Sequence, residues 1–326
     1  MRLFVFPLLF LFLLCYSCKE TTGGGLPENS ATVPPRALEK TSLIVLGTTQ
    51  DAGSPHIGCT RDCCKVLFTH PEADRKVVAL GLTDPENGKC YLMEATPDLP
   101  EQMHLLNLYA PFNEKRTPDG IFLTHAHIGH YTGLMYLGKE GLGSTGVPVY
   151  AMPEMGVFLS QNGPWSQLVA RDNIALREMA SHEPVRLTAN LQVTPFTVPH
   201  RDEYSETAGY IISGPHKKVL FIPDIDKWEK WETSITDLIA EVDYALIDGT
   251  FYDAADISHR DISEIPHPFI TESMERFKAL PEREKRKIRF IHFNHTNPVL
   301  RPESKISRHI LSNGYGIARM YDVIEL

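Results

Sequence analysis

One short stretch constrains the fold of this chain more than any other: an apolar strand pattern that runs directly into three histidines, in residues 120–130 (GIFLTHAHIGH). Successive side chains of a strand point to opposite faces, so His125 and His127 point the same way at its end. His130 follows where a helix is expected to begin. Three imidazoles with an open fourth position are typical of a catalytic zinc site. The spacing therefore predicts a bound metal and an enzyme, rather than histidines scattered over a loop.

The rest of the folded part alternates strand-like and helix-like segments. β-Branched or aromatic runs bounded by Gly, Pro, Asn or Asp predict strands, and apolar residues at helical spacing predict helices. The predicted strands are residues 42–47, 76–82, 89–95, 120–126, 147–152, 191–198, 209–214, 218–223, 243–248 and 288–293, and the predicted helices are residues 97–109, 130–138, 228–241 and 270–280. Two groups of strands with interspersed helices predict a layered α/β sandwich. We interpret residues 155–182, with Trp165, as a loop and expect it to shape the substrate pocket.

The N-terminal part has the composition of a targeting segment. The apolar run over residues 3–14 is too short to span a bilayer and has the length of a signal-peptide core. Ser17 then precedes Cys18, a pattern that resembles a bacterial lipoprotein signal, although an ordinary secretory signal or an uncleaved anchor is the alternative. The expected organisation is a signal peptide over residues 1–18 with Cys18 as the lipid acceptor, a flexible linker over residues 19–40, and a catalytic domain over residues 41–326. This pattern predicts a lipid-anchored protein of the bacterial cell envelope, in the periplasm or facing the surface.

The charge balance argues against one class of partner. The chain has 32 Lys and Arg against 41 Asp and Glu, a formal net charge of -9. A mildly acidic protein has no general electrostatic reason to hold nucleic acid. The densest basic run, residues 283–289 (REKRKIR), is interpreted as a solvated helix end. We therefore expect a small-molecule substrate, contact with the membrane through the lipid anchor, and no nucleic acid.

The histidine motif resembles the H-x-H-x-D-H signature of the metallo-β-lactamase superfamily, and later segments follow in the order of that family. Strand patterns run into a histidine after residue 199, an aspartate after residue 223 and a histidine after residue 291. The resemblance implies a four-layer αββα sandwich. The ligands that it implies are His125, His127 and His200 for a first metal and His130, Asp224 and His292 for a second, with Asp224 bridging the two. It also implies a zinc-dependent hydrolase of a phosphodiester or another ester, using a metal-bound hydroxide.

Two further segments resemble the same family. Residues 245–252 (ALIDGTFY) resemble a strand that ends near the metals, which implies that Asp248 lies close to the site and orients a ligand. Residues 265–271 resemble the segment that carries the catalytic histidine of the phosphodiesterase and tRNase Z branch. The implied role of His267 is to donate a proton to the leaving group or to hold a phosphate oxygen, and the alternative is an exposed loop histidine.

One position departs from the family signature. Gly129 stands where the motif has its aspartate, so the second metal loses a carboxylate ligand and is weak, absent or differently held. Asp51 lies in the loop after the first strand, which is near the active site in this fold. It is therefore an additional candidate ligand. The alternative is that Asp51 only caps a turn.

Three cysteines in six residues, in residues 58–64 (GCTRDCC), predict a second metal site. Coenzyme PQQ synthesis protein B and the phosphonate-pathway cyclic-phosphate phosphodiesterase, two branches of the same superfamily, also have clustered cysteines after the first strand. In the latter, a histidine three residues beyond the last catalytic-site histidine completes the structural zinc site. The implied set here is Cys59, Cys63, Cys64 and His295. A disulfide between Cys59 and Cys63 or Cys64 is the alternative, and Cys90 is interpreted as a buried small hydrophobe.

Three functions remain open at this point. The first is a hydrolase with one or two catalytic zinc ions and a structural one. The second is an iron-dependent hydroxylase, as the branch of PQQ synthesis protein B implies, since imidazole also suits iron and manganese. The third is a surface-tethered binding protein without catalysis. The retained histidines and Asp224 argue against the third, because an inactive descendant has no need of them.

Overall fold

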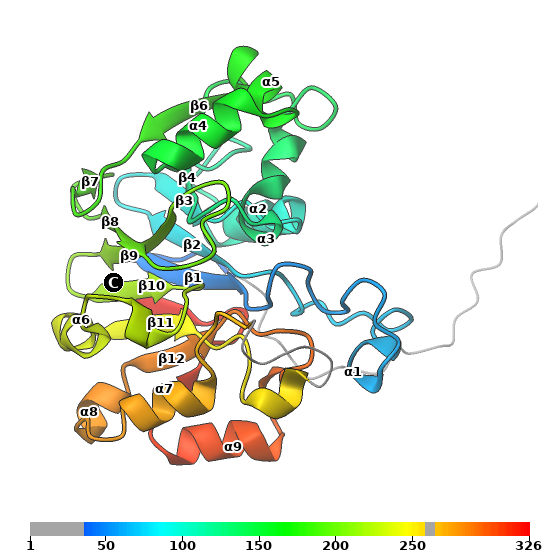
Figure 1. The fold of residues 1–326 in the computed structure, drawn as a ribbon. Coiled ribbons are helices and arrows are strands. Elements are labelled where there is room, and N and C mark those ends of the chain that lie inside the picture. The colour runs from blue at the N-terminus through cyan, green and yellow to red at the C-terminus, as the bar shows by residue number, and fades with distance from the viewer. Residues whose placement is uncertain (1–35, 258–264) are drawn as a thin grey trace, which may run out of the picture. The chain divides into compact units, whose positions relative to one another are not determined.

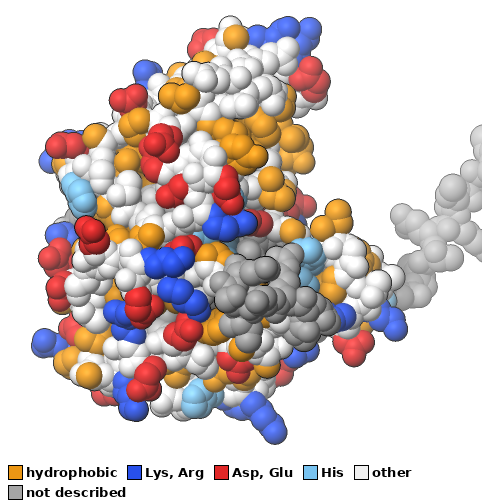
Figure 2. Space-filling view, in the orientation of Figure 1, with side chains coloured by type: hydrophobic (Ala, Val, Ile, Leu, Met, Phe, Trp, Pro, Cys, Tyr) orange, Lys and Arg blue, Asp and Glu red, His pale blue; other side chains and the backbone are white. Residues whose placement is uncertain are grey.

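The computed structural model describes residues 36–257 and 265–326. The predicted lipid acceptor Cys18, the signal peptide and most of the linker lie outside these residues. Within the described part of the chain, no helix combines the length and apolar character that a membrane crossing requires. The face shown in Figure 2 carries acidic and basic side chains interspersed with one another.

Two sheets of seven strands form the middle of the described fold (Figure 1). The first has the order β14-β1-β2-β3-β4-β5-β6, and the second has the order β13-β12-β11-β10-β9-β8-β7. The strands of the first are β1 (Ser42–Gly47), β2 (Ala79–Asp84), β3 (Lys89–Met93), β4 (Gly120–Phe122), β5 (Val147–Ala151), β6 (Ile174–Glu178) and β14 (Val323–Glu325). Those of the second are β7 (Val185–Arg186), β8 (Gln192–Val198), β9 (Thr207–Ser213), β10 (Lys218–Ile222), β11 (Tyr244–Asp248), β12 (Ile288–Ile291) and β13 (Gly316–Ile317).

Helices cover the outer face of each sheet. On the first sheet these are α2 (Leu99–Tyr109), α3 (Ile128–Tyr131), the 3-10 helix η1 (Thr132–Leu137), α4 (Pro153–Gln161) and α5 (Trp165–Ala170). On the second they are η2 (Trp228–Lys230), α6 (Ile235–Glu241), α7 (Ile270–Arg276), η5 (Pro298–Leu300) and α9 (Lys305–Ser312). The short helix α8 (Glu282–Lys285) buries none of its residues, and α1 (Asp62–Lys65) and η3 (Ala254–Ile257) lie in loops. Figure 1 shows α4 and α5 at one end of the stack and α7 to α9 at the other. The predicted αββα sandwich is therefore confirmed.

Successive side chains of a strand alternate between the core that separates the two sheets and the layer of helices outside. Along β4, Phe122 points into the space between the sheets, whereas Ile121 points outward toward the helices of the first sheet. The Phe122 ring stacks on Tyr150 with ring centroids 4.3 Å apart, and it meets Tyr210 of the second sheet edge-on at 6.1 Å. Such aromatic pairs add to the large apolar area that they bury. They hold the two sheets face to face at the point where β4 ends.

Parallel pairing places the ends of several strands at one edge. Strands β10, β11 and β12 run parallel to one another, and β8 runs in the same direction because both it and β10 are antiparallel to β9. The carboxyl ends of parallel strands meet at one edge of a sheet, which is where ligands bind in such folds. The residues that follow β8, β10, β11 and β12 therefore lie close to one another, and those that follow β4 lie beside them.

Candidate metal centre

Two overlapping groups of side chains form the centre of the site, and each predicted ligand belongs to at least one of them. Residues that follow strand ends supply most of their members. The first group is His125, His127, His200 and Asp224, and the second is Asp51, His130, Asp224 and His292; the candidate ligand atoms of each group lie within 4.8 Å of one another. Asp224 belongs to both groups. The structure thus brings together all six predicted ligands, and it adds Asp51.

The centre is buried, and its ionisable side chains lie close to one another. His130 and His292 are fully buried, and Asp224 is 2% exposed. Burial alone would raise the pKa of Asp224, but the charges of the surrounding imidazoles, led by His200, hold it well below its usual range. Burial, with the charge of His130 beside it, lowers the pKa of His125 well below its usual range. Asp224 is therefore a carboxylate enclosed by imidazole rings.

Each of the five histidines has its outer ring nitrogen next to a fixed partner. The pairs are His125 Nδ1 with Thr124 Oγ1 (2.9 Å), His127 Nε2 with Glu203 Oε2 (3.1 Å), His130 Nδ1 with Glu94 Oε1 (3.2 Å), His200 Nδ1 with Asp226 Oδ1 (3.3 Å) and His292 Nδ1 with Thr250 Oγ1 (2.9 Å). Such partners set the tautomer and the ring orientation of metal-binding histidines. Sequence reasoning missed these five partners, because four of them are set apart from their histidines along the chain.

The side chains fit a metal ion. His200 Nε2, His292 Nε2 and Asp224 Oδ1 are buried and face the centre, yet none makes a hydrogen bond with another described residue. Unpaired buried polar atoms are costly, and atoms of this kind are explained by an ion that they coordinate. Imidazole nitrogens with carboxylate oxygens suit zinc, iron or manganese. His292 itself has a φ of 67°, in the left-handed region that non-glycine residues adopt at a cost.

His267 and Asp248 lie beside the centre, as predicted. His267 Nδ1 is 2.9 Å from Asp248 Oδ2 and 3.1 Å from Asp224 Oδ1. Its side chain is buried, so the alternative of an exposed loop histidine is wrong. Burial alone would lower the pKa of His267, but the carboxylates of Asp248 and Asp224 raise it to about 10. The hydroxyl and backbone N–H of Thr250 both donate to Asp248 Oδ1, which fixes that carboxylate.

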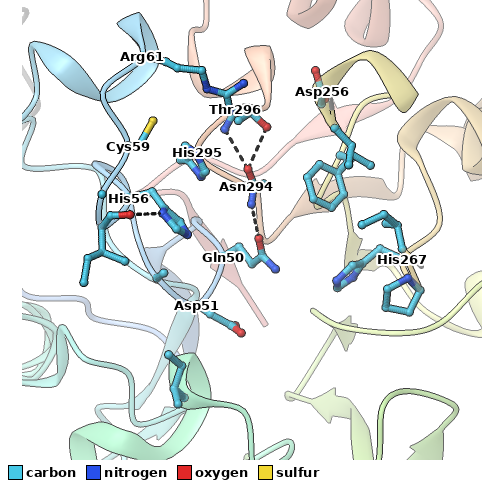
Figure 3. Close-up of a pocket in the computed structure, with 18 of the residues that line it drawn as sticks. Gln50, Asp51, His56, Cys59, Arg61, Asp256, His267, Asn294, His295 and Thr296 are labelled. Carbon is cyan, nitrogen blue, oxygen red and sulfur yellow. Dashed lines mark hydrogen bonds between the residues drawn. The ribbon is translucent and has the colours of Figure 1, made fainter. Parts of the chain in front are cut away.

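A cavity of about 620 Å³ opens beside the centre. Figure 3 shows His56, Cys59 and Arg61 on one side of it, His267 and Asp256 on the other, and Gln50 with Asn294 between them. The prediction that residues 155–182 form a loop that shapes the pocket is wrong. Much of this stretch belongs to α4, α5 and β6, and the described lining contains none of these residues. Trp165 instead packs on Tyr131 and Phe158 in the outer layer of the first sheet, with ring centroids 4.7 and 6.0 Å away.

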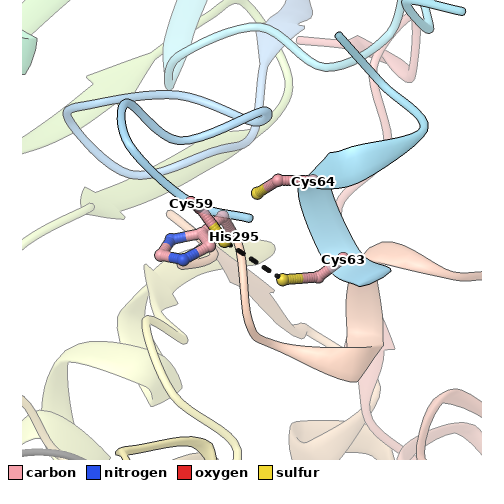
Figure 4. Close-up of side chains that lie close together, drawn as sticks. All are labelled: Cys59, Cys63, Cys64 and His295. Atoms are coloured by element: carbon pink, nitrogen blue, oxygen red, sulfur yellow. Dashed lines mark hydrogen bonds between the residues drawn. The ribbon is translucent and has the colours of Figure 1, made fainter. Parts of the chain in front are cut away.

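The predicted cysteine cluster also comes together. Figure 4 shows Cys59, Cys63, Cys64 and His295 converging, and their candidate ligand atoms lie within 4.8 Å of one another. Cys59 Sγ and Cys63 Sγ are 3.7 Å apart, far beyond the roughly 2.05 Å of a disulfide. All three cysteines are free thiols in this structure. Cys90 is fully buried in the outer core of the first sheet, which confirms its interpretation as a small hydrophobe.

Comparison with known families and proteins gives matches over most of the chain. The family model described as beta-lactamase superfamily domain matches residues 90–293. Coenzyme PQQ synthesis protein B from Methylorubrum extorquens (strain PA1) is 24% identical over 301 residues, covering 85% of this chain and 97% of that protein. The protein of the same name from Acinetobacter baylyi is 25% identical over 289 residues, covering 80% of this chain and 92% of that protein.

Solved structures show the same fold. Zn²⁺-bound PqqB from Methylobacterium extorquens has a TM-score of 0.71 at 21% identity, covering 87% of this chain and 100% of its own. A diphosphatase from the PhnP family has a TM-score of 0.59 at 20% identity, with 88% and 97% covered. Human tRNase Z, short form, has a TM-score of 0.53 at 15% identity, with 87% and 98% covered. At these identities the likeness establishes the architecture alone.

Proposed function

Because the chain belongs to the β-lactamase superfamily, we propose that it is a zinc-dependent hydrolase that cleaves a phosphodiester or another ester. One observation carries this proposal: the six predicted ligands converge beside an open cavity, and His267 stands in the wall of that cavity. A zinc ion held by these side chains would activate water and polarise the bond that is cleaved. The third function, a binding protein without catalysis, does not account for His267 and the carboxylate of Asp248 beside the ligands.

His267 is suited to act on the leaving group. Its Nδ1 lies against the carboxylate of Asp248, which orients the ring and favours its protonated form. Its Nε2 makes no hydrogen bond with another described residue, and Figure 3 shows the ring directed into the cavity. Donation of the Nε2 proton to a departing oxygen is therefore the step that we assign to His267. Asp248 positions the ring and is not itself in contact with substrate.

The cavity favours an anionic substrate. Arg61 and Arg201 both line it and are exposed, and Arg61 makes no ion pair with another residue that the structure describes. A guanidinium pairs with phosphate in two parallel hydrogen bonds. The neighbouring Asn294 and Thr296 add polar groups to the same wall. These groups support a phosphodiester over a neutral ester.

We also propose a structural zinc ion at Cys59, Cys63, Cys64 and His295. Three thiols and an imidazole form the closed four-ligand set of structural sites. His295 stacks against His56, with ring centroids 4.2 Å apart, which holds its ring beside the thiols. The disulfide alternative has less support, because a single Cys59–Cys63 bond would leave Cys64 and His295 without a role.

The second candidate function is an iron-dependent hydroxylase, and two observations support it. The curated relatives that match over most of their length are named for coenzyme PQQ synthesis. In addition, His130 and His292 form a set of two histidines and two carboxylates with Asp51 and Asp224, and imidazole suits iron as well as zinc. Against it, Asp51 supplies a carboxylate to the group that lacks one at Gly129, so this group keeps the donors for a second metal beside the first.

The cell-envelope location remains a proposal that rests on residues 1–18. Labelling of the chain in growing cells with a radioactive fatty acid tests it, with Cys18→Ala as the comparison. Label in the natural chain but not in the variant supports a lipid anchor, whereas equal label in both, or none in either, contradicts it.

The experiment that tests the function measures metal content and hydrolysis together. The purified full chain is analysed by inductively coupled plasma mass spectrometry and assayed on bis(p-nitrophenyl) phosphate and p-nitrophenyl acetate. We expect zinc to be bound, His127→Ala to abolish hydrolysis, and His267→Ala to lower the rate by about 10²–10⁴-fold with metal retained. His104→Ala, an exposed histidine of α2, is the control. Iron in place of zinc, with no hydrolysis of either compound, would favour the hydroxylase instead.

A further inference from the structure

We propose that Asp51 is the carboxylate ligand of the second metal, and that residue 129 is glycine because Asp51 occupies the space of its side chain. The proposal rests on the metal binding of the proposed function. It goes beyond that function because it assigns the missing ligand to a different element of the fold. The aspartate of the family signature belongs to the histidine motif, whereas Asp51 belongs to the loop after β1.

Contacts place Asp51 among the second group of ligands. Its Oδ1 is 3.0 Å from His130 Nε2 and 3.5 Å from His292 Nε2. The same two nitrogens face Asp224 Oδ2 at 3.7 and 3.9 Å. Two imidazole nitrogens thus lie close to two carboxylates that come from separate elements of the fold. This is a set of donors for one ion, with His130 and His292 turned so that their Nε2 atoms face it.

Gly129 and Asp51 compete for one volume. A Cβ placed on Gly129 would lie 2.6 Å from Asp51 Oδ1 and 2.9 Å from Asp51 Cβ, and it would overlap the Asp51 Cα as well. Carbon atoms in contact stay about 3.5–4.0 Å apart. No side chain at position 129 fits while Asp51 holds its place. The two positions are therefore alternative sources of the same carboxylate, and this chain uses the one outside the motif.

The loop that carries Asp51 is fixed to the second sheet. The backbone N–H of Gln50 donates to the Phe293 carbonyl at 2.9 Å, and the N–H of Phe293 donates to the Thr48 carbonyl at 2.7 Å. The Asn294 side chain also donates to the Gln50 side chain. Because Phe293 directly follows His292, this pairing sets the distance between Asp51 and His292. The arrangement is a rigid one, as a metal ligand requires.

The alternative role of Asp51, capping a turn, has no support in the described residues. The turn is closed by its own backbone, with the Gly53 N–H donating to the Gln50 carbonyl at 2.7 Å. The Asp51 carboxylate accepts no hydrogen bond from a described backbone N–H, and its hydrogen-bond partner is the ring of His130. An aspartate that served the turn would accept from the backbone two residues on. The side chain is directed at the metal group instead.

The test is an exchange of the two residues. Zinc content is measured by inductively coupled plasma mass spectrometry, and zinc affinity by competition with a chelator, for the full chain and for Asp51→Ala, Gly129→Asp and the double variant Asp51→Gly/Gly129→Asp. We expect Asp51→Ala to weaken the second zinc of the histidine centre by at least about tenfold. Gly129→Asp alone should do the same through steric overlap. The double variant should bind the second zinc no better than Gly129→Asp, because the backbone Cα at position 51 still overlaps the new Cβ.

Controls separate this proposal from the function on which it rests. Asp74→Ala, an exposed aspartate outside both groups, should bind as the natural chain does. Zinc retained by the cysteine cluster and an unchanged circular dichroism spectrum would show that each variant is folded. Unaltered zinc binding in Asp51→Ala would overturn the ligand assignment while leaving the hydrolase proposal intact. Absence of any zinc that depends on His127 in the natural chain would instead defeat the proposed function itself.

Discussion

Glu203 is the most exposed of the groups that orient the metal-centre histidines. Its side chain is 49% exposed, whereas Glu94, which holds His130, is fully buried. Glu203 Oε2 lies 3.1 Å from His127 Nε2, so that the Nε2 proton is held outward and Nδ1 is left to face the centre. Arg201 approaches the same nitrogen at 3.3 Å. The orientation of His127 thus depends on a surface carboxylate.

We predict that Glu203→Ala lowers zinc affinity at the histidine centre by about 10–100-fold, the usual cost of losing such a partner. Glu203→Gln should lose much less, because its amide oxygen still accepts from His127 Nε2. Chelator competition measures both, and Glu183→Ala, at an exposed turn residue, serves as the matched control. Equal affinities in the Ala variant and the natural chain would show that Glu203 does not orient His127.

What the sequence can predict at this scale depends on distance along the chain. His125, His127 and His130 were predictable because local strand geometry sets their directions. His200, Asp224 and His292 were predictable only through family order. Glu94 and Glu203 were not predictable, since their contacts with the histidines arise from the packing of separate elements. Glu94 also has a φ of 78°, which no sequence pattern indicates for a glutamate.

At the scale of elements, the loop between β1 and α1 joins the histidine centre to the cysteine cluster. Residues 51–59 carry Asp51 at the histidine centre and Cys59 at the cysteine cluster. Between them, His56 and Ile57 line the cavity. The Ile57 side chain is 80% exposed, so little apolar packing fixes the tip of the loop. We infer that the metal at the cysteine cluster holds this wall of the cavity.

We predict that Cys63→Ser removes one zinc ion per chain and loosens this loop. The expected results are faster cleavage by trypsin at Arg61, a higher KM and a kcat changed by less than about threefold, since the histidine ligands are untouched. Mass spectrometry of the metal and of the fragments measures the outcome. Cys90→Ser, which alters a thiol outside the histidine centre and the cysteine cluster, is the control. Loss of kcat without a change of KM would contradict a wall-forming role.

The prediction of elements succeeded where periodicity was strong and failed where pairing is long-range. The helix predicted over residues 97–109 is α2, two residues shorter at its start. The helix predicted over residues 130–138 is instead α3 followed by η1. Gly133 there packs so closely on the Ala95 and Thr96 carbonyls that no side chain fits. Strand β14 was missed because its three residues pair with β1 from the other end of the chain.

At the scale of the whole fold, a buried carboxylate links the two sheets. Asp84 ends β2 in the first sheet and is fully buried. Its Oδ2 accepts from Thr188 Oγ1 at 2.6 Å, and its Oδ1 accepts from Asn190 Nδ2 at 3.2 Å, both in the turn before β8 of the second sheet. Burial alone would raise the pKa of Asp84, but these hydrogen bonds, led by that of Thr188, lower it below its usual value.

The direction of this pKa shift predicts an acid-sensitive contribution to stability. Because the folded pKa lies below the unfolded one, the contribution is present above the unfolded pKa of about 4 and is lost as pH falls through the folded pKa. Asp84→Ala should therefore cost on the order of 3 kcal/mol at pH 7, and less at pH 3. Urea unfolding at both values measures this. A cost that is equal at pH 3 and pH 7 would mean that the charge of Asp84 contributes nothing.

The exchange between Gly129 and Asp51 bears on how proteins of this kind are recognised. A search that requires an aspartate inside the histidine motif would pass over this chain, although Asp51 brings a carboxylate oxygen to the ring of His130 from another loop. Two positions separated by 78 residues compete for one volume in three dimensions and are unrelated in any one-dimensional signature. Relatives should therefore be sorted by where a donor atom ends up in space, and those with glycine in the motif should be examined for an acid in the first loop.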